Sequence, residues 1–415
     1  MAGRAVVVGG GGIGVASAYY LNRSGWDVTL VDKGGIGRGC SYGNAGLIVP
    51  SHSEPIPGPG VIGQALRFMT KKDSPFYVRP RLDAGLLRFF WQFRRYCNAA
   101  KSRHAFGALL SLSAGSLELY EELRRDGDAD FFFERRGVVE VALTEDGLEH
   151  FQHARDALDA AGFTTKLLSR DEALAIEPAL SPNIRGGLFT EGEAHGSSFA
   201  YVTSLAATLE KRGARILANH AVSRLVHDRE RHIKGVELDR GETLEADLVV
   251  LAAGAWSRTL AKTLGVDIPL QPAKGYSCTI DTFEGAPSYP ILVKERRVIV
   301  TPLDSRLRFA GTLELTGFDE TIHGARYDAV KRAGCEILNT QPPMENEEPW
   351  SGLRPVTPDG LPIVDWAKPY RGLLVATGHA MLGFTQSPMT GKLVAELASG
   401  EQPSISLEPF RLDRF

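Results

Sequence analysis

A run of glycines near the amino end carries the most specific chemical signal in the sequence. Residues 9–14 read Gly-Gly-Gly-Gly-Ile-Gly, which fits the pattern G-x-G-x-x-G. Gly9 suits a tight turn, Gly11 lets the main chain approach a pyrophosphate, and Gly14 allows a helix to pack closely on a strand. Asp32 follows 23 residues after Gly9 and can accept hydrogen bonds from a ribose. We therefore expect a dinucleotide whose ribose is unphosphorylated, because Asp32 would repel a 2′-phosphate.

The elements around this motif are those that such a site requires. A short apolar strand at Ala5–Val8 leads into the glycines, and the motif opens a helix that Gly25 is placed to end. A second strand at Val28–Val31 delivers Asp32 at its carboxyl end. The first N–H groups of the helix then face the phosphates, where the helix dipole favours negative charge.

Length and composition limit the class of protein. The 415 residues, 43% of them hydrophobic, favour two domains over one large core. A formal charge of -3 gives no reason to expect a nucleic-acid partner. The residues before the first strand are too few for a secretory signal, and no stretch of about 18 apolar residues could span a membrane. We expect a cytoplasmic protein and leave open a peripheral contact with the inner face of the cell membrane.

The cysteines point away from metal and disulfide chemistry. They are scattered and form no C-x-x-C pair, which argues against a zinc site or a disulfide framework. We expect no metal and interpret them as small packed hydrophobic residues. The four positions are Cys40, Cys97, Cys278 and Cys335.

Residues 84–125 are expected to be helical, because apolar residues recur there near helical spacing. Between Leu86 and His104 this segment carries five basic and five aromatic residues and no acidic one. A basic, aromatic helix of this kind can lie on an anionic membrane surface or against a partner. The alternative is that the aromatic residues belong to the core and the bases to a solvated face.

The order of the expected elements inserts a second domain between pieces of the first. We assign residues 1–50, 195–265 and 350–415 to a nucleotide-binding domain, and residues 51–194 and 266–349 to a substrate-binding domain. The elements expected in the second domain are helices at 63–69, 84–125, 146–161 and 325–338 and strands at 137–143, 277–281, 297–301 and 307–312. A polar linker at 342–349 would return the chain to the first domain.

A glycine-rich loop after Asp32 narrows the choice of cofactor. Residues 34–47 end in Cys-Ser-Tyr-Gly-Asn-Ala-Gly-Leu, which a simple NAD-binding unit does not need at this point. Here the sequence resembles the FAD-dependent D-amino-acid oxidase superfamily, and within it the bacterial D-amino-acid dehydrogenases of the small-subunit type. The resemblance extends over nearly the whole chain. It implies an α/β fold, with a Rossmann-like FAD-binding domain of the glutathione-reductase type and an inserted sheet-and-helix substrate domain.

The resemblance assigns FAD contacts to several parts of the chain. Ser41 to Leu47 would wrap the pyrophosphate and ribityl chain, and the turn at Ala253 and Gly254 would close the second wall of the site. Val222 would present its backbone to the adenine, although an ordinary strand valine is the alternative there. The expected FAD-contacting residues are Gly9, Gly11, Gly12, Ile13, Gly14, Asp32, Lys33, Ser41, Asn44, Ala45, Gly46, Leu47, Val222, Ala253, Gly254, Trp256, Gly378, His379, Leu382, Gly383, Phe384 and Thr385.

A second glycine loop precedes the last helix. An expected strand at Leu373–Thr377 is followed by Gly378 to Gly383 and then by a helix expected over about 384–399. We expect the start of this helix to face the N1–C2=O edge of the flavin, where backbone donors and the helix dipole would stabilise the negative charge of the reduced ring. Glycine at 378 and 383 would then avoid a collision with the ring.

Arg354 is the expected substrate-binding residue. A planar guanidinium can bind an α-carboxylate bidentately and so direct the Cα–H of the substrate toward flavin N5. The resemblance also implies a carboxylate-binding arginine at this position, whereas the alternative is a surface ion pair. Tyr276 would supply a second hydrogen bond, unless it is only a packing residue. His379 is a weaker candidate for lining the ring.

The implied reaction is the oxidative deamination of a D-amino acid. Hydride would pass from Cα to flavin N5, the imino acid would be hydrolysed to a 2-oxo acid, and the electrons would pass to a quinone or another carrier. We assign no general base, because the lone pair of a neutral amine can expel the hydride.

Several alternatives stay open. Similar dehydrogenases often carry an arginine where this chain has Pro302, and residues 306–314 resemble members that act on D-hydroxyproline and other cyclic imino acids. An amine oxidase of the glycine or sarcosine type, which would use oxygen, is the second reading. An electron-relay flavin subunit of a complex is the third. Assembly into a homo- or hetero-oligomer is also left open.

Overall fold

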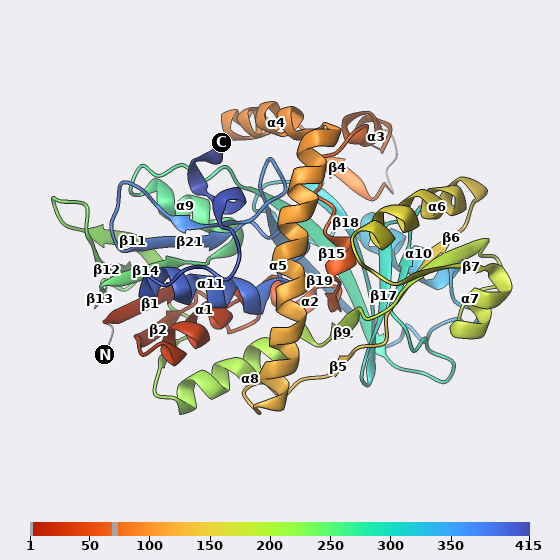
Figure 1. The fold of residues 1–415 in the computed structure, drawn as a ribbon, viewed down its shortest axis with the longest axis horizontal. Coiled ribbons are helices and arrows are strands. Elements are labelled where there is room, and N and C mark those ends of the chain that lie inside the picture. The colour runs from red at the N-terminus through yellow and green to blue at the C-terminus, as the bar shows by residue number, and fades with distance from the viewer. Residues whose placement is uncertain (1–2, 69–73) are drawn as a thin grey trace.

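Two halves, each built around a large sheet, lie side by side in the computed structural model, which describes residues 3–68 and 74–415 (Figure 1). Both ends of the chain lie in the half on the left of Figure 1. The long helix α5 (Ala99–Arg125) runs down the middle of the view, between the two halves.

The first half is organised by a six-stranded sheet in the order β10-β2-β1-β14-β21-β20. Its strands are β1 (Arg4–Val8), β2 (Asp27–Val31), β10 (Arg215–Leu217), β14 (Leu248–Leu251), β20 (Ile363–Trp366) and β21 (Leu373–Thr377). Neighbouring strands are parallel except β20, which runs antiparallel to β21. β1 is buried after its first residue, as a parallel strand covered on both faces must be.

Different layers cover the two faces of this sheet. On one face, a single apolar cluster joins β1 to residues of α5 and of the helices α1 (Gly12–Arg23), α8 (Ser198–Lys211) and α11 (Ser387–Ser399). On the other face, a second cluster joins it to α9 (Ser257–Lys262) and to a three-stranded sheet. The strands of that small sheet are β11 (Val222–His227), β12 (Ile233–Leu238) and β13 (Thr243–Glu245).

The second half contains a nine-stranded sheet with the path β19-β15-β18-β17-β16-β6-β8-β7, to which β4 adds beside β18. Its strands are β4 (Phe76–Val78), β6 (Val138–Ala142), β7 (Thr165–Ser169), β8 (Gly186–Thr190), β15 (Gln271–Asp281), β16 (Ile291–Val293), β17 (Val298–Leu303), β18 (Arg306–Leu315) and β19 (Glu348–Val356). One face packs on α7 (Arg170–Ile176) and α10 (Gly324–Glu336). The opposite face meets α4 (Ala84–Tyr96).

Short elements link the two halves. A small sheet pairs β3 (Leu47–Ile48) and β5 (Phe133–Glu134) with β9 (Ala194–Gly196). The remaining helices are α2 (Cys40–Gly43), α3 (Val61–Phe68) and α6 (Glu145–Ala160). None of the helices formed by the described residues is both long and apolar enough to cross a membrane.

The structure corrects several expected boundaries. The single expected helix at 84–125 is two helices, because α4 ends at Tyr96 and Asn98 caps the start of α5. The expected strand 277–281 is the end of the longer β15. The expected short helix corresponds to α3, and its expected last residue, Met69, lies outside the described residues.

The largest correction concerns the linker expected before residue 350. Residues 348–356 form β19, which pairs with β15 in the nine-stranded sheet. Residues 350–356 therefore belong with the sheet of the second half, although the sequence-based division placed them in the first. The rest of that division stays a prediction.

Candidate functional site

The glycine motif forms a tight turn between β1 and α1. Gly9 has φ +116°, and a Cβ built on it would lie 2.4 Å from the carbonyl oxygen of Ala252. A Cβ on Gly14 would lie 1.7 Å from the carbonyl oxygen of Gly9, so this position also requires glycine. Gly11, by contrast, is the residue before α1, and a Cβ on it would meet only the Ser41 hydroxyl, at 3.7 Å. Packing does not require glycine at position 11, which fits close approach of a ligand.

The acidic residue at the end of β2 is fixed by main-chain donors. The Asp32 carboxylate accepts hydrogen bonds from the N–H groups of Gly10, at 2.6 Å, and Gly34, at 2.7 Å. The next residue, Lys33, places its ammonium 3.3 Å from the centre of the Trp256 ring. Lys33 and Trp256, both expected at the cofactor, therefore touch each other.

The other residues expected around the adenosine lie beside this corner. Val222 begins β11, and two residues before it the N–H of His220 donates to the carbonyl oxygen of Asp32. On the other side of β1, Ala253 and Gly254 follow β14, and the Thr377 hydroxyl donates to the carbonyl oxygen of Gly254 at 2.9 Å. The adenine contact expected of Val222 stays a prediction.

The loop from Ser41 to Leu47 is tied to its surroundings by hydrogen bonds. The Ser41 hydroxyl accepts from the N–H of Gly12 at 3.0 Å, which holds the loop against the start of α1. The Asn44 side chain accepts from the N–H of Gly46, whose φ is +71°. This loop and the glycine motif therefore form one wall.

Three residues that sequence reasoning missed also hold this loop. The Ser198 hydroxyl donates to the carbonyl oxygen of Ser41. Thr301 donates to the carbonyl oxygen of Ala45 at 2.7 Å, and Arg308 donates to that of Asn44 at 2.9 Å. Burial lowers the pKa of Arg308 to about 10. No local pattern distinguishes these side chains, because β17 and β18 meet the loop only in the folded chain.

The second glycine loop lies beside the first wall. The Thr385 hydroxyl donates to the carbonyl oxygen of Leu47 and accepts from the N–H of Val49. Phe384 directs its ring into the core against Tyr120, at 5.4 Å between ring centres, so only its backbone remains for the cofactor. The Thr385 contacts therefore join the second glycine loop to the end of the first glycine-rich loop.

The last helix begins later than the sequence predicted. α11 starts at Ser387, and residues 383–386 form turns before it. The N–H groups of Gly383, Phe384 and Thr385 donate no hydrogen bond to any residue of the described chain. Free donors of this kind are what a flavin carbonyl edge would satisfy.

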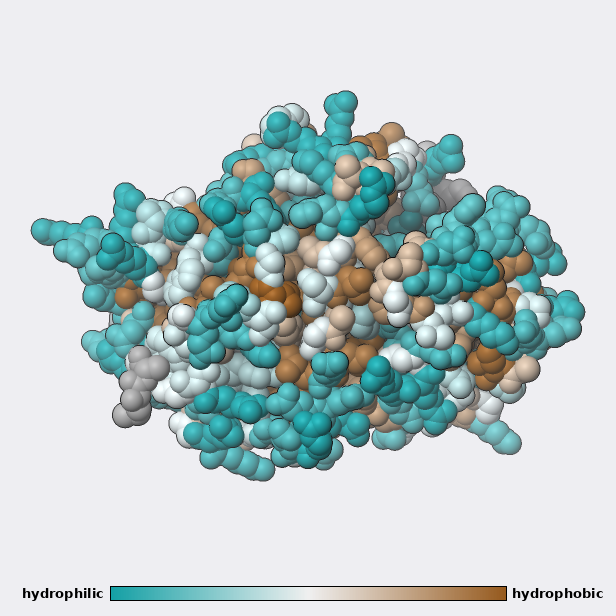
Figure 2. Space-filling view, in the orientation of Figure 1, coloured by the Kyte–Doolittle hydropathy of each residue, from teal (hydrophilic) through white to brown (hydrophobic). Residues whose placement is uncertain are grey.

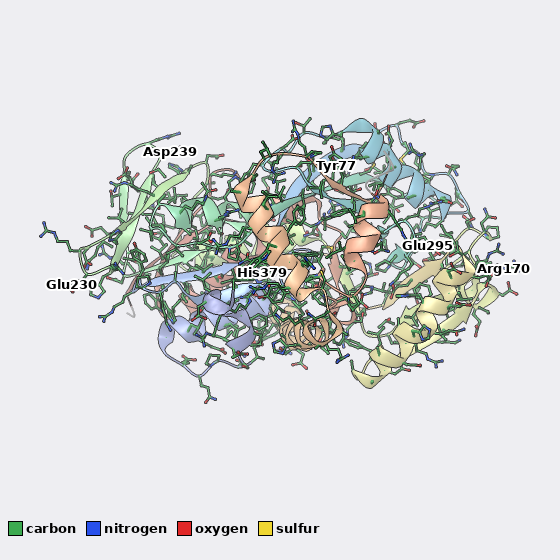
Figure 3. The ribbon with its side chains drawn as sticks, turned by 90° about the horizontal axis from the view of Figure 1, so that it is seen from above. Tyr77, Arg170, Glu230, Asp239, Glu295 and His379 are labelled. Carbon is green, nitrogen blue, oxygen red and sulfur yellow. The ribbon has the colours of Figure 1, made fainter. Side chains whose placement is uncertain are left out.

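His379 lies near the middle of the molecule, between the two halves (Figure 3). Its Nε2 forms a hydrogen bond with the Thr390 hydroxyl at 2.9 Å, and its Nδ1 is buried without a partner in the described structure. Burial lowers the pKa of His379 to about 3, so the ring is neutral at physiological pH. A neutral ring can line the cofactor but cannot act as a cationic acid.

Arg354 lies in β19, between one residue that contacts Cys40 of α2 and another that contacts the second glycine loop. The N–H of Ala380 donates to the carbonyl oxygen of Pro355 on one side, and the Cys40 thiol donates to that of Leu353 on the other. The Arg354 guanidinium donates to the carbonyl oxygen of Thr312 at 2.8 Å.

The Arg354 guanidinium lacks an anionic partner in the part of the chain that the structure describes. Within residues 3–68 and 74–415, no carboxylate lies within ion-pair distance of it. A Cβ on Gly275 would lie 2.1 Å from its Nη1, so glycine there allows the side chain to cross β15. Burial lowers the pKa of Arg354, yet an arginine remains charged. Such a guanidinium has the charge and the planar donor geometry to bind a carboxylate.

Tyr276 does not share this site, which corrects the sequence-based prediction. Side chains alternate along β15, so Gly275 meets Arg354 whereas Tyr276 points to the opposite face. There Tyr276 is 1% exposed in the cluster with Val330 of α10. Tyr276 therefore lies on the opposite side of β15 from the Arg354 guanidinium.

Pro302 also points away from the cofactor. Its neighbours Thr301 and Leu303 face the loop, since Thr301 bonds to Ala45 and a Cβ on Gly46 would touch Leu303. Pro302 lies between them on the strand and therefore faces the other side of the sheet.

These features fit FAD. Among the described residues, a Cβ on Gly11 would meet only the Ser41 hydroxyl, the N–H groups of residues 383–385 have no acceptor, and the Arg354 guanidinium has no carboxylate partner. When bound, FAD supplies a ring that accepts two electrons. In the described part of the chain, no group of His, Cys, Asp and Glu residues is arranged to hold a metal ion.

Comparisons with known proteins identify the family and the fold of the chain. A D-amino acid dehydrogenase of Methylobacterium sp. (strain 4-46) is 33% identical over 99% of this chain and 99% of its own. The fold matches a glycine oxidase from Geobacillus kaustophilus with a TM-score of 0.78 at 24% identity, covering 100% of this chain and 99% of the other. It also matches an L-proline dehydrogenase from P. horikoshii with a TM-score of 0.74 at 21% identity, covering 99% and 97%. A family profile described as FAD dependent oxidoreductase matches residues 4–397, and the chain belongs to that family.

Proposed function

We propose that this protein is an FAD-dependent dehydrogenase that oxidises the Cα–N bond of a D-amino acid. The observation that carries the proposal is the Arg354 guanidinium, which donates to the carbonyl oxygen of Thr312 and has no carboxylate partner among the described residues. A bidentate arginine would fix the α-carboxylate and thereby the Cα–H of the substrate. The D configuration is supported by the relatives, whose names describe D-amino acid dehydrogenases.

The groups beside Arg354 leave proton removal to the substrate itself. His379 is neutral, and burial raises the pKa of the Cys40 thiol to about 11, so this thiol stays protonated at physiological pH. The amino group must therefore lose its proton to solvent before the bond is oxidised. We expect kcat/KM to rise with pH until the substrate amine is neutral.

An anaerobic titration tests this function. The holoprotein is mixed with a panel of D- and L-amino acids, prolines and N-methylglycine while the flavin absorbance is followed. D-Amino acids should bleach the flavin and their L forms should not. Bleaching by N-methylglycine with stoichiometric hydrogen peroxide in air would favour an amine oxidase, and no bleaching by any amine would favour an electron-relay subunit.

We further propose that the electron acceptor is a membrane quinone and that the protein reaches it through the surface formed by α3 and α4. These helices lie on the same side of the molecule (Figures 1 and 3), where Figure 2 shows apolar and polar atoms mixed along the upper rim. Leu87 is 64% exposed and Trp91 is 59% exposed on α4, and Leu66 is exposed on α3. Arg95 stacks 4.1 Å from the centre of the Trp91 ring. Apolar side chains among bases suit the interface of an anionic bilayer.

Vesicle flotation tests this surface. The holoprotein should float with vesicles that contain anionic phospholipid and remain in solution with purely zwitterionic vesicles. Exchanging Leu87 and Trp91 for serine should abolish flotation without changing bleaching by the amino acid. Flotation that is equal for both vesicle types, or that survives the exchange, would contradict the proposal.

A further inference from the structure

The segment between β18 and α10, residues 316–323, crosses from the nine-stranded sheet to the cofactor wall. Its Phe318 ring lies 5.6 Å from the Trp256 ring, measured between ring centres. Trp256 in turn carries the Lys33 ammonium on its ring. Burial lowers the pKa of Lys33, and the Glu320 carboxylate of the same segment opposes that shift. The segment therefore meets the first half at two residues expected to contact FAD.

A buried lysine of β15 holds this segment against the nine-stranded sheet. Lys274 of β15 is fully buried, and its ammonium donates to the carbonyl oxygen of Thr321 at 2.9 Å. The same ammonium lies 3.6 Å from the Asp319 carboxylate and 3.7 Å from that of Glu314. Three acceptors, two of them on the segment, thus converge on one positive charge.

The charges under the segment form a connected group. Glu314 is also fully buried, and Arg326 at the start of α10 places Nη1 at 3.3 Å from it. Arg326 stacks on Tyr77, which is labelled in Figure 3, with its guanidinium carbon 3.9 Å from the ring centre. Burying charges is costly unless they are paired, so this group favours one position of the segment.

Phe318 itself is not held by a core. Its side chain is 49% exposed, and its described ring contact is with Trp256 of the other half. A half-exposed aromatic residue on an anchored segment is suited to closing over a neighbouring ligand. A second anchor lies nearby, because the Ser351 hydroxyl of β19 donates to the carbonyl oxygen of Glu320.

We propose that residues 316–323 form a strap that closes over bound FAD at Trp256 and slows its release. Phe318 makes the closing contact, and Lys274 is the positioning residue that holds the strap on β15. The proposal rests on FAD binding at the site described above and does not depend on which amine is oxidised.

The rate of FAD release tests the strap. Holoprotein is diluted, and the rise of flavin fluorescence is followed for the wild type and for Phe318→Ala. The variant should release FAD about tenfold faster, since an aromatic contact on this scale is lost. Ile322→Ala, an exposed apolar residue of the same strap, is the matched control and should release FAD at the wild-type rate. The melting temperature of the apoproteins should be the same for all three.

Hydrogen exchange tests the role of Lys274. FAD should slow the exchange of the amides of residues 317–323 in the wild type, and Lys274→Met should remove that protection and speed FAD release. If Lys274→Met does not fold, Asp319→Asn should give the same two effects to a smaller degree. The double variant with Phe318→Ala should release FAD no faster than the faster single variant, because both act through one contact.

Two results would overturn the strap. One is an unchanged release rate in Phe318→Ala, and the other is exchange of residues 317–323 that FAD does not slow. Neither measurement uses an amino acid, so a failed strap and a failed assignment of the D-amino-acid substrate can be told apart.

Discussion

The Ser387 hydroxyl donates to the carbonyl oxygen of Gly12 at 2.8 Å, across 375 positions of the chain. Ser387 is the first residue of α11 and Gly12 is the first residue of α1, so the amino ends of these helices are fixed side by side. Farther along, Gly391 packs against Ala16. Segments from the two ends of the chain therefore pack together beside the glycine motif.

Two glycines of the last segment should respond differently to alanine. A Cβ on Gly391 would lie 2.5 Å from the carbonyl carbon of Ala16, so Gly391→Ala should lower the free energy of unfolding by roughly 2 kcal/mol. A Cβ on Gly383 would meet only the Cβ of His379, at 3.6 Å, so Gly383→Ala should leave the apoprotein stable and weaken FAD binding. Chemical denaturation and FAD titration separate the two effects. Equal FAD affinity in Gly383→Ala would place the flavin ring elsewhere.

Replacing Arg354 should weaken the binding of the amino-acid substrate and leave FAD bound. Arg354→Ala removes a charge-assisted clamp worth about 2 kcal/mol, which is roughly a thirtyfold rise in the dissociation constant of the amino acid. Arg354→Lys keeps the charge but loses the bidentate geometry, so its dissociation constant should fall between those of the wild type and Arg354→Ala. Arg224→Ala, which breaks an exposed ion pair with Glu237, is the control. Anaerobic titration gives the constants, and unchanged affinity in Arg354→Ala would move the clamp to another residue.

Thr301 should contribute to FAD binding although it is far from the glycine motif in sequence. Thr301→Val keeps the shape of the side chain but leaves the carbonyl oxygen of Ala45 without its 2.7 Å hydrogen bond. We expect FAD affinity to fall about tenfold, the effect of one buried carbonyl left unpaired. Thr203→Val, which removes a hydroxyl bond to Phe199 within α8, should leave FAD affinity unchanged.

Glu193 should make stability depend on pH. Burial raises the pKa of Glu193 to about 7, although its Oε1 accepts from the N–H of Ser51 and the charges of His52 and Arg135 oppose the shift. Since the folded pKa exceeds the unfolded one, folding stability is lost as the pH rises through about 7. Glu193→Gln keeps the acceptor and removes the charge, so it should stabilise the protein by up to roughly 3 kcal/mol at pH 8 and much less at pH 5. Melting temperatures at the two values measure this, with exposed Glu191→Gln expected to show no such difference.

The nucleotide wall could be predicted because its residues are neighbours in sequence. The strand, the glycines, the helix and Asp32 lie within one short stretch, and each position depends on local backbone geometry. The sequence also predicted a glycine loop before the last helix, but it did not predict that this helix, α11, starts at Ser387. Proline at position 388 and the turns of residues 383–386 are compatible with either start.

Side-chain faces and strand partners were decided by the tertiary structure. Tyr276 and Gly275 are adjacent in sequence, yet only the pairing of β15 with β19 shows that Gly275 and not Tyr276 meets Arg354. Nothing in the sequence around Lys274 distinguishes it from a surface lysine. Its buried charge is paired with Asp319, which a different segment supplies. A sequence determines the local conformations that each residue favours, whereas contacts between distant segments exist only after the chain has packed. In this chain, local motifs were enough to predict a dinucleotide site at the amino end. The side chains that pack around those motifs became known only from the folded structure, because distant segments supply them.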